Sequence, residues 1–170
     1  IGGSLALDLQ SLGFKVHGLV HKENTIEIAK KRRLAQVIST SPSILSDCEL
    51  IILALPLTQL LEPSEALVNA LPTCATVTDV GSVKAPVLKV WKTLHRHFVA
   101  SHPMAGTNES GVNAGQRNLF KKRPWVVTPD PDTNPEALEN VRRLALAIGS
   151  TWVTTEADIH DQAVALISHL

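Results

Sequence analysis

The stretch LIILALP at residues 50–56 determines the expected fold class of this chain. Six consecutive apolar residues that end at a proline are typical of a short strand buried on both faces, as in a parallel sheet covered by helices. Strand-like and helix-like patterns alternate on either side of it, which favours an α/β fold with a doubly wound parallel sheet. The expected strands are 14–20, 50–55, 75–80, 98–101, 125–128 and 151–154; the expected helices are 2–12, 23–33, 57–71, 136–148 and 157–170, with one more starting at Lys84.

Composition and charge argue against several classes of protein. The chain has 170 residues, of which 44% are apolar, and its 16 basic side chains balance 16 acidic ones. This balance argues against nucleic acid as the main partner. Cys48 and Cys74 are too few and too far apart to suggest a disulfide scaffold or a metal site, so we expect a reducing, cytoplasmic setting. No signal peptide or apolar run long enough to cross a membrane is visible, and we expect no membrane partner.

A histidine near a predicted strand end is the main candidate for chemistry. His102 lies within the sequence SHPMAG at residues 101–106, directly after a strand-like run, and Pro103 disfavours helical geometry at His102. Ligands of α/β proteins usually bind at the carboxyl ends of strands, and histidine is suited to proton transfer near neutral pH. Taken alone, the pattern fits equally well a turn histidine that merely caps a strand.

Two further segments make the functional interpretation more specific. IGGSLA stands at residues 1–6 and TDVGSVK at residues 78–84, about twenty residues before SHPMAG. In this order and spacing, the three segments resemble the nucleotide-binding domain of the prephenate/arogenate dehydrogenase family, and HPMAG is the most specific of them. The similarity extends to residues 118–129 and 160–170, and so covers essentially the whole chain.

The resemblance implies a Rossmann-type domain followed by an all-helical dimerisation domain. We therefore expect residues 1–155 to form the nucleotide-binding domain and residues 156–170 to begin the helical one, with a homodimer as the assembly. Such a sheet has its first strand just before the glycine-rich turn, whereas this sequence starts within the turn at Ile1. We expect the natural protein to carry about ten more residues there, the length of a strand with its turn, and to continue beyond Leu170.

The expected cofactor site begins at the first helix. Gly2 matches the third glycine of the dinucleotide-binding pattern G-x-G-x-x-G, which allows close packing of helix and strand. The backbone N–H groups of Gly3 and Ser4 would face the pyrophosphate at the positive end of this helix. Alone, a Gly-Gly-Ser helix start is more often an ordinary cap. The resemblance also places Leu55, Pro56, Val80 and Gly81 at the cofactor.

Three residues bear on the choice between NADP and NAD. His21 and Lys22 end the second strand of the family's sheet, and Thr25 follows one turn later. NAD sites usually place a carboxylate here to bind the ribose hydroxyls. A carboxylate would repel a 2′-phosphate and Lys22 would attract it, so we expect NADP, with NAD possible. The alternative is that Lys22 is simply a solvated residue at a helix start.

The resemblance implies oxidative decarboxylation of arogenate and/or prephenate in tyrosine biosynthesis. His102 would take the proton of the substrate's 4-hydroxyl while hydride leaves C4 for the nicotinamide. Ser82 would lie near the nicotinamide and the reacting substrate, and Ser168 and His169 would approach the substrate from the second domain. Loss of CO2 is driven by aromatisation of the ring, so no metal is needed.

Two other functions compete with this one. The first is another NADP-dependent dehydrogenase of the 6-phosphogluconate or hydroxyacid type, and the second is a non-catalytic nucleotide-binding module. HPMAG argues against the former, and the presence of both His102 and Ser82 argues against the latter. Some roles stay open: Lys84 is as well suited to the surface as to function, and His160 beside Asp161 fits a surface pair or a support for the site. Of the remaining histidines, His17 is expected to be structural, and His95 and His97 to be solvated.

Overall fold

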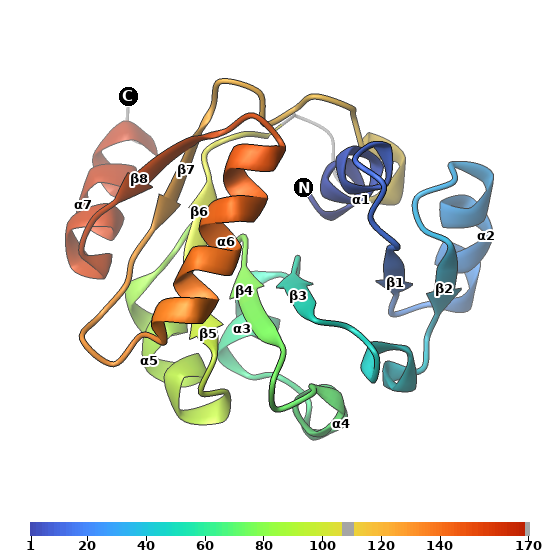
Figure 1. Cartoon of the computed structure of the whole chain (residues 1–170), viewed down its shortest axis with the longest axis horizontal. Coiled ribbons are helices and arrows are strands. Elements are labelled where there is room, and N and C mark those ends of the chain that lie inside the picture. The colour runs from blue at the N-terminus through green and yellow to red at the C-terminus, as the bar shows by residue number, and fades with distance from the viewer. Residues whose placement is uncertain (107–110, 169–170) are drawn as a thin grey trace.

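The computed structural model describes residues 1–106 and 111–168, and these form an α/β fold (Figure 1). The helices are α1 (Gly2–Ser11), α2 (Glu23–Lys31), α3 (Leu57–Leu61), α4 (Glu65–Ala70), α5 (Ala85–Leu94), α6 (Pro135–Ala147) and α7 (Ala157–Ser168), with short 3₁₀ turns at Pro42–Leu45 and Val112–Ala114. The strands are β1 (His17–Leu19), β2 (Val37–Ser39), β3 (Leu50–Leu53), β4 (Thr76–Asp79), β5 (Phe98–Val99), β6 (Ser101–Pro103), β7 (Pro124–Val127) and β8 (Thr151–Thr154).

The strands form three hydrogen-bonded groups. β1 pairs with β2, β4 lies between β3 and β5, and β7 lies between β6 and β8. The pairs are parallel, as the sequence predicted, except for β6 with β7, which pair antiparallel. Only Ala100 separates β5 from β6, so the chain leaves its pairing with β4 and joins β7 within a few residues. No ladder joins β1 to β3 among the described strands.

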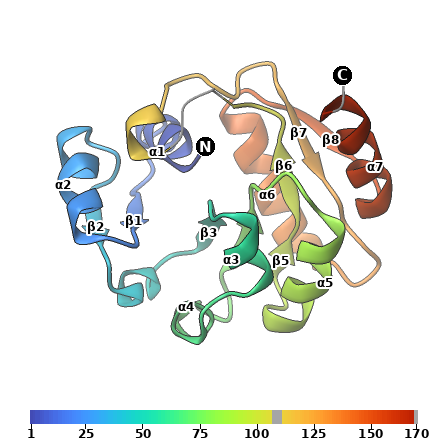
Figure 2. The same cartoon turned by 180° about the vertical axis from the view of Figure 1, so that it is seen from behind.

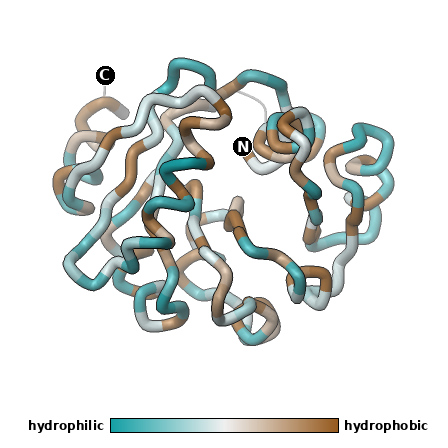
Figure 3. The backbone as a smooth tube through the Cα atoms, viewed as in Figure 1, coloured by the Kyte–Doolittle hydropathy of each residue, from teal (hydrophilic) through white to brown (hydrophobic). Residues whose placement is uncertain are grey.

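Helices cover both faces of the β3–β4–β5 group, as a doubly wound fold requires. α6 packs against β4 and β5 on one face, and α5 packs against β5 and α3 on the other (Figures 1 and 2). Hydropathy alternates along α6, whose residues Ala137, Val141 and Leu144 are buried (Figure 3). None of the helices in residues 1–106 and 111–168 combines the length and apolar character needed to cross a bilayer.

The core divides between the two faces of the sheet. On the α5 face, Trp91 is fully buried, stacks on Phe98 with ring centroids 5.5 Å apart, and donates its indole N–H to the carbonyl of Leu60 at 2.8 Å. This bond joins α5 to α3. On the α6 face, Phe120 and Trp125 are both fully buried, with centroids 6.0 Å apart. Large aromatic side chains thus hold helices to both faces of the sheet that carries the site.

Two elements differ from the sequence-based expectation. The predicted helix over 57–71 is broken into α3 and α4 around Pro63, since proline supplies no N–H for a helix interior. The second piece begins at Ser64, whose hydroxyl accepts a bond from the N–H of Leu67 at 3.3 Å. β2 was not predicted because Val37–Ser39 is only three residues long and contains too few positions to show a strand period.

Candidate active site

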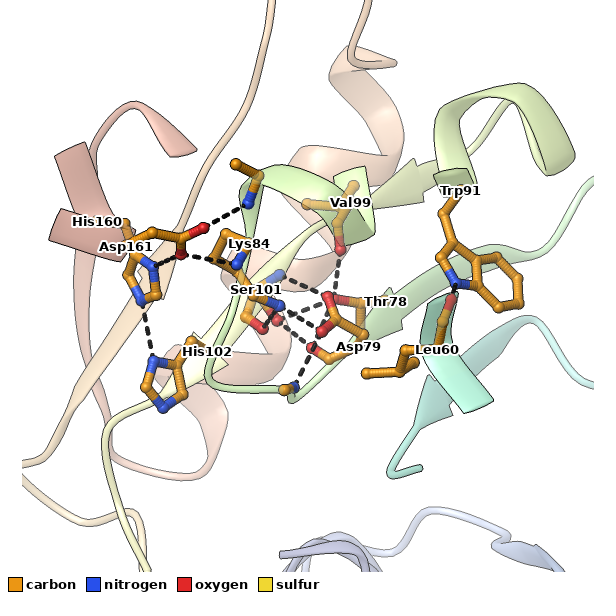
Figure 4. Close-up of polar contacts among 12 residues, drawn as sticks. Leu60, Thr78, Asp79, Lys84, Trp91, Val99, Ser101, His102, His160 and Asp161 are labelled. Carbon is orange, nitrogen blue, oxygen red and sulfur yellow. Dashed lines mark hydrogen bonds and ion pairs between the residues drawn. The ribbon is translucent and has the colours of Figure 1, made fainter. Parts of the chain in front are cut away.

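A buried ion pair lies where the chain passes from β5 to β6. The side chains of Asp79 and Lys84 are fully buried, and the ammonium of Lys84 donates to Asp79 Oδ2 and, at 2.7 Å, to the carbonyl of Ser101 (Figure 4). Asp79 Oδ1 accepts the N–H of Ser101 at 3.1 Å, and Oδ2 accepts the N–H of Gly81 at 2.9 Å. This arrangement decides the open question about Lys84, which is an interior residue and not a surface one.

Burial and pairing have opposing effects on these two groups. Burial raises the pKa of Asp79 above its ordinary value, while Lys84 and the N–H groups of Gly81 and Ser101 act to lower it. Burial lowers the pKa of Lys84, and the charge of Asp79 opposes that shift. Each charge is tolerated in the interior because the other is in contact with it and because backbone groups fill the remaining hydrogen-bond positions.

His102 is the first member of a chain of three polar side chains. Its Nδ1 lies 2.9 Å from Nε2 of His160, and Nδ1 of His160 lies 2.7 Å from Oδ1 of Asp161 (Figure 4). Asp161 also accepts the N–H of Lys84 at 2.7 Å and of Ala85 at 2.9 Å, at the start of α5. His160 is only 3% exposed and contacts His102, so the surface-pair interpretation is wrong.

The surroundings of His102 favour its neutral form. Burial, followed by repulsion from His160 and Lys84, lowers the pKa of His102 to about 4, although Asp161 acts in the opposite direction. Burial alone would raise the pKa of Asp161, but bonds from Ala85, His160 and Lys84 hold it below its ordinary value. At neutral pH the site therefore combines an uncharged imidazole with an ionised carboxylate.

A cleft of about 340 Å³ brings His102 together with Ser82. His102 is half-buried and Ser82 is exposed. The walls are mainly apolar and come from the loop after β6 and from α7; the lining residues are Ser82, His102, Met104, Ala105, Gly106, Val164 and Ile167. A cleft of this size with mainly apolar walls suits a small organic ring, and Ser82 and His102 supply polar side chains to it.

The start of α1 has features of a dinucleotide-binding turn. A Cβ atom added to Gly2 would lie 2.9 Å from the Cβ of Ala54, directly after β3, so a side chain here would force the helix off the strand. The first N–H groups of α1 have no partner within the helix and are available to an anion. The hydroxyl of Ser4 instead accepts the N–H of Gln116 at 2.9 Å and is buried. The role expected of Ser4 uses its backbone N–H and not this hydroxyl.

The other expected cofactor residues follow the carboxyl ends of strands. Leu55 and Pro56 follow β3, and Val80 and Gly81 follow β4; the parallel register pairs Leu53 with Asp79, so these ends lie side by side. His21, Lys22 and Thr25 follow β1, in a different hydrogen-bonded group, with His21 and Lys22 exposed. Ser168 ends α7, its side chain is outside what the structure describes, and His169 lies outside the described residues.

Three participants were not assigned from sequence. Asp79, Lys84 and Asp161 lack a recognisable spacing relative to His102, although the similarity to the family's segments around residues 78–84 and 160–165 pointed to their neighbourhood.

His95 was expected to be solvated, but it is buried and its Nε2 lies 3.0 Å from the carbonyl of Pro72. His17 is structural as expected, with Nδ1 2.8 Å from the carbonyl of Ile44. Within the described residues, no group of three or more potential ligand side chains could hold a metal.

Three features define a Rossmann-type dinucleotide-binding domain. They are a mostly parallel sheet with helices on both faces, an exposed helix start at the strand ends, and a histidine in the adjoining cleft. The family model for the nucleotide-binding domain of prephenate dehydrogenase matches residues 5–154. The chain therefore belongs to the prephenate dehydrogenase family.

Relatives of known structure and sequence agree with this assignment. The crystal structure of Synechocystis arogenate dehydrogenase has a TM-score of 0.92 and 35% identity, over 98% of this chain and 60% of that one. Aquifex aeolicus prephenate dehydrogenase, in complex with hydroxyphenyl propionate and NAD+, has a TM-score of 0.91 and 29% identity, over 98% and 60%. A cyclohexadienyl dehydrogenase of Zymomonas mobilis is 33% identical over 126 residues, which are 73% of this chain and 43% of that protein. The chain spans about half the length of such relatives.

Proposed function

We propose that the full-length protein catalyses the oxidative decarboxylation of prephenate, arogenate or both, with a nicotinamide cofactor, in tyrosine biosynthesis. The observation that carries the proposal is the position of His102, which lines an apolar cleft with Ser82 and has its Nδ1 engaged by His160. This leaves Nε2 of His102 as the ring nitrogen free of that bond. The names of the relatives, which include arogenate, prephenate and cyclohexadienyl dehydrogenases, support the same reaction.

His102 acts as the general base in this proposal. Its lowered pKa keeps the imidazole neutral at pH 7, so that Nε2 can accept the proton of the substrate's 4-hydroxyl. A bound oxidised nicotinamide would supply the acceptor for the hydride that leaves C4. The C1 carboxylate then leaves as CO2 and the ring becomes aromatic, a step for which no additional protein group is needed. Ser82 lies in the same cleft and is exposed, which suits a hydroxyl that contacts the substrate.

The cofactor proposal is NADP, bound through residues after β1, β3 and β4 and at the start of α1. Gly2, Gly3 and the backbone of Ser4 would hold the pyrophosphate, and Leu55, Pro56, Val80 and Gly81 would pass beneath the remainder of the cofactor. Lys22 is exposed at the start of α2 and would attract a 2′-phosphate, while the adjacent carboxylate of Glu23 accepts a bond from Thr40. His21 and Thr25 complete this part of the site. NAD stays possible, since one relative was solved with it.

The remaining proposals concern domains, assembly and location. Residues 1–155 form the cofactor domain and residues 156–170 begin a helical domain, in keeping with a family match that ends at residue 154. Ser168 and His169 belong to that second part and would contact the substrate. Ile159, Leu166 and Ile167 expose 54%, 72% and 61% of their surface, and such an apolar face favours cover by further chain in a homodimer. The two free cysteines favour a cytoplasmic location.

Steady-state kinetics of the full-length protein with prephenate and arogenate, each paired with NAD and NADP, test the reaction. His102→Asn should lower kcat by about 10²–10⁴-fold, the range for a general base, while cofactor binding measured by titration stays intact. A variant within a few-fold of wild-type turnover would exclude His102 as the base. Absence of turnover with every pair in the wild-type protein would exclude the proposed reaction.

A further inference from the structure

We propose that His160 and Asp161 are positioning residues that fix the ring and the tautomer of His102. The proposal rests on the proposed function, because it assumes that Nε2 of His102 receives the substrate proton. Its structural basis is the uninterrupted chain of contacts from His102 to His160 to Asp161, with heavy-atom distances of 2.9 and 2.7 Å. The two rings are nearly perpendicular, at 82°, with centroids 5.1 Å apart.

The carboxylate determines where the protons lie. Oδ1 of Asp161 only accepts, so Nδ1 of His160 must carry hydrogen; two acceptors at 2.7 Å would repel each other. When the imidazole of His160 carries a single hydrogen, that hydrogen is on Nδ1, its Nε2 is an acceptor, and Nδ1 of His102 must donate to it. Nε2 of His102 is left with its lone pair. This is the tautomer that a general base needs, and a carboxylate that holds a histidine in the required tautomer is known from serine proteases.

Asp161 is itself held rigidly. Its two oxygens accept the N–H groups of Lys84 and Ala85, which are otherwise unpaired at the start of α5. With His160 donating as well, Asp161 cannot rotate without breaking a bond. The same carboxylate therefore caps a helix of the cofactor domain and orients the histidine beside the cleft.

The position of these residues in the chain has a functional consequence. His160 and Asp161 lie on α7, after the end of the family's nucleotide-binding match at residue 154, whereas His102 lies within it. α7 packs against α5, and Val164 and Ile167 of the same helix line the cleft. The base is thus competent only when α7 is docked on the domain that holds the cofactor.

Kinetics of the full-length protein can separate positioning from general structural support. His160→Leu removes the acceptor for His102 and should lower kcat by about 10²-fold or more, with the Kd for NADP unchanged. His160→Gln offers an amide oxygen in place of Nε2 and should recover part of that loss. His95→Gln, which also removes a buried and hydrogen-bonded histidine, serves as the matched control and should leave kcat within twofold of wild type.

Asp161→Ala offers an independent route. It removes the acceptor that keeps hydrogen on Nδ1 of His160, so neither imidazole of the pair is held in one tautomer and kcat should again fall about 10²-fold or more. The groups facing His102 are His160, Lys84 and Asp161. Loss of the Asp161 charge should move the acid limb of kcat/KM to lower pH, and loss of His160 should move it to higher pH. A merely structural defect would not shift the limb in opposite directions.

Two further measurements decide the outcome. In a His102→Asn background, His160→Gln and Asp161→Ala should cost nothing more, because both act through His102; an additional loss would overturn the proposal. ¹⁵N-histidine NMR of the wild-type protein should show His102 protonated at Nδ1, and the opposite tautomer would also overturn it. If His102→Asn abolishes turnover while the His160 and Asp161 variants stay within twofold of wild type, the positioning role is wrong and the general-base role stands. If His102→Asn itself has no effect on kcat, the general-base role in the proposed function is wrong, and the positioning role that depends on it is wrong too.

Discussion

Removal of one member of the buried Asp79–Lys84 pair should destabilise the protein strongly. Lys84→Met keeps much of the side chain's volume but removes the ammonium that donates to Asp79 and to the carbonyl of Ser101. The carboxylate of Asp79 is then buried without a counter-charge. Such a loss typically costs about 3–5 kcal/mol, most of it from the remaining charge and not from the lost attraction.

The pH dependence of the variant provides a second signature. Burial already raises the pKa of Asp79, and removal of Lys84 takes away the main group opposing that shift. An acid whose pKa is higher in the folded state binds its proton more tightly there. The free energy of unfolding of Lys84→Met should therefore decrease as pH rises from the ordinary carboxyl pKa towards the raised one, by about 1.4 kcal/mol per pH unit.

Thermal unfolding of the full-length protein, followed between pH 4 and 8, measures both effects. Lys92→Met is the matched control: Lys92 is an exposed lysine 3.1 Å from Asp130, and its loss should leave the free energy of unfolding close to that of the wild type. The double variant Asp79→Leu, Lys84→Met should be more stable than Lys84→Met alone, because no unpaired charge remains. A Lys84→Met protein as stable as the control variant would refute the argument that the pair is a buried, mutually dependent unit.

Three further outcomes are expected. Lys22→Asp should weaken NADP binding by about 1–3 kcal/mol and spare NAD, as measured by titration; unchanged NADP affinity would mean that Lys22 only faces solvent. With the pKa of His102 near 4, kcat/KM should hold well below pH 6.5 and fall as pH approaches 4 and the base takes up a proton; an acid limb near 6.5 would contradict this. Asn134→Ala removes the side-chain oxygen that accepts the N–H of Ala137 at the start of α6, and thermal unfolding should show a loss of about 1 kcal/mol in stability. The exposed substitution Glu136→Gln is the control and should cause no change.

Sequence patterns predicted those parts of the fold that depend on local order. The buried strand β3 is a continuous apolar run, and β8 was predicted at its observed bounds, 151–154. Both inferences need only neighbours along the chain, which is why they could be made without coordinates. The turn expected at His102 was wrong, because His102 is the middle residue of β6 and pairs with Val126.

Contacts between distant segments could not be predicted in the same way. The antiparallel pairing of β6 with β7 joins residues more than twenty positions apart, and the two-residue β5 gives no period to reveal the change. The burial of Lys84 was equally hidden, since lysine is usually a surface residue and its partner Asp79 has no helical spacing to it. His160 could be placed beside His102 only once α7 had been packed against α5.

The buried pair and the histidine chain meet at Lys84, and this explains why a charged residue is placed in the interior. Between β5 and β6 the chain changes its pairing partner from β4 to β7, and there side chains bond the backbone of Ser101. Asp79 accepts the N–H of Ser101, and Lys84 donates to its carbonyl. Ser101 directly precedes His102, so the pair fixes the backbone that carries the imidazole. The N–H of Lys84 is at the same time bound by Asp161, whose other partner, His160, holds the imidazole ring. One residue thus connects the backbone and the side-chain supports of His102. A neutral residue at position 84 would keep the bond from its backbone N–H to Asp161 but lose the bonds of the ammonium to Asp79 and to the carbonyl of Ser101. The functional cost of Lys84→Met should therefore arise from displacement of β6 and not from a changed tautomer of His102.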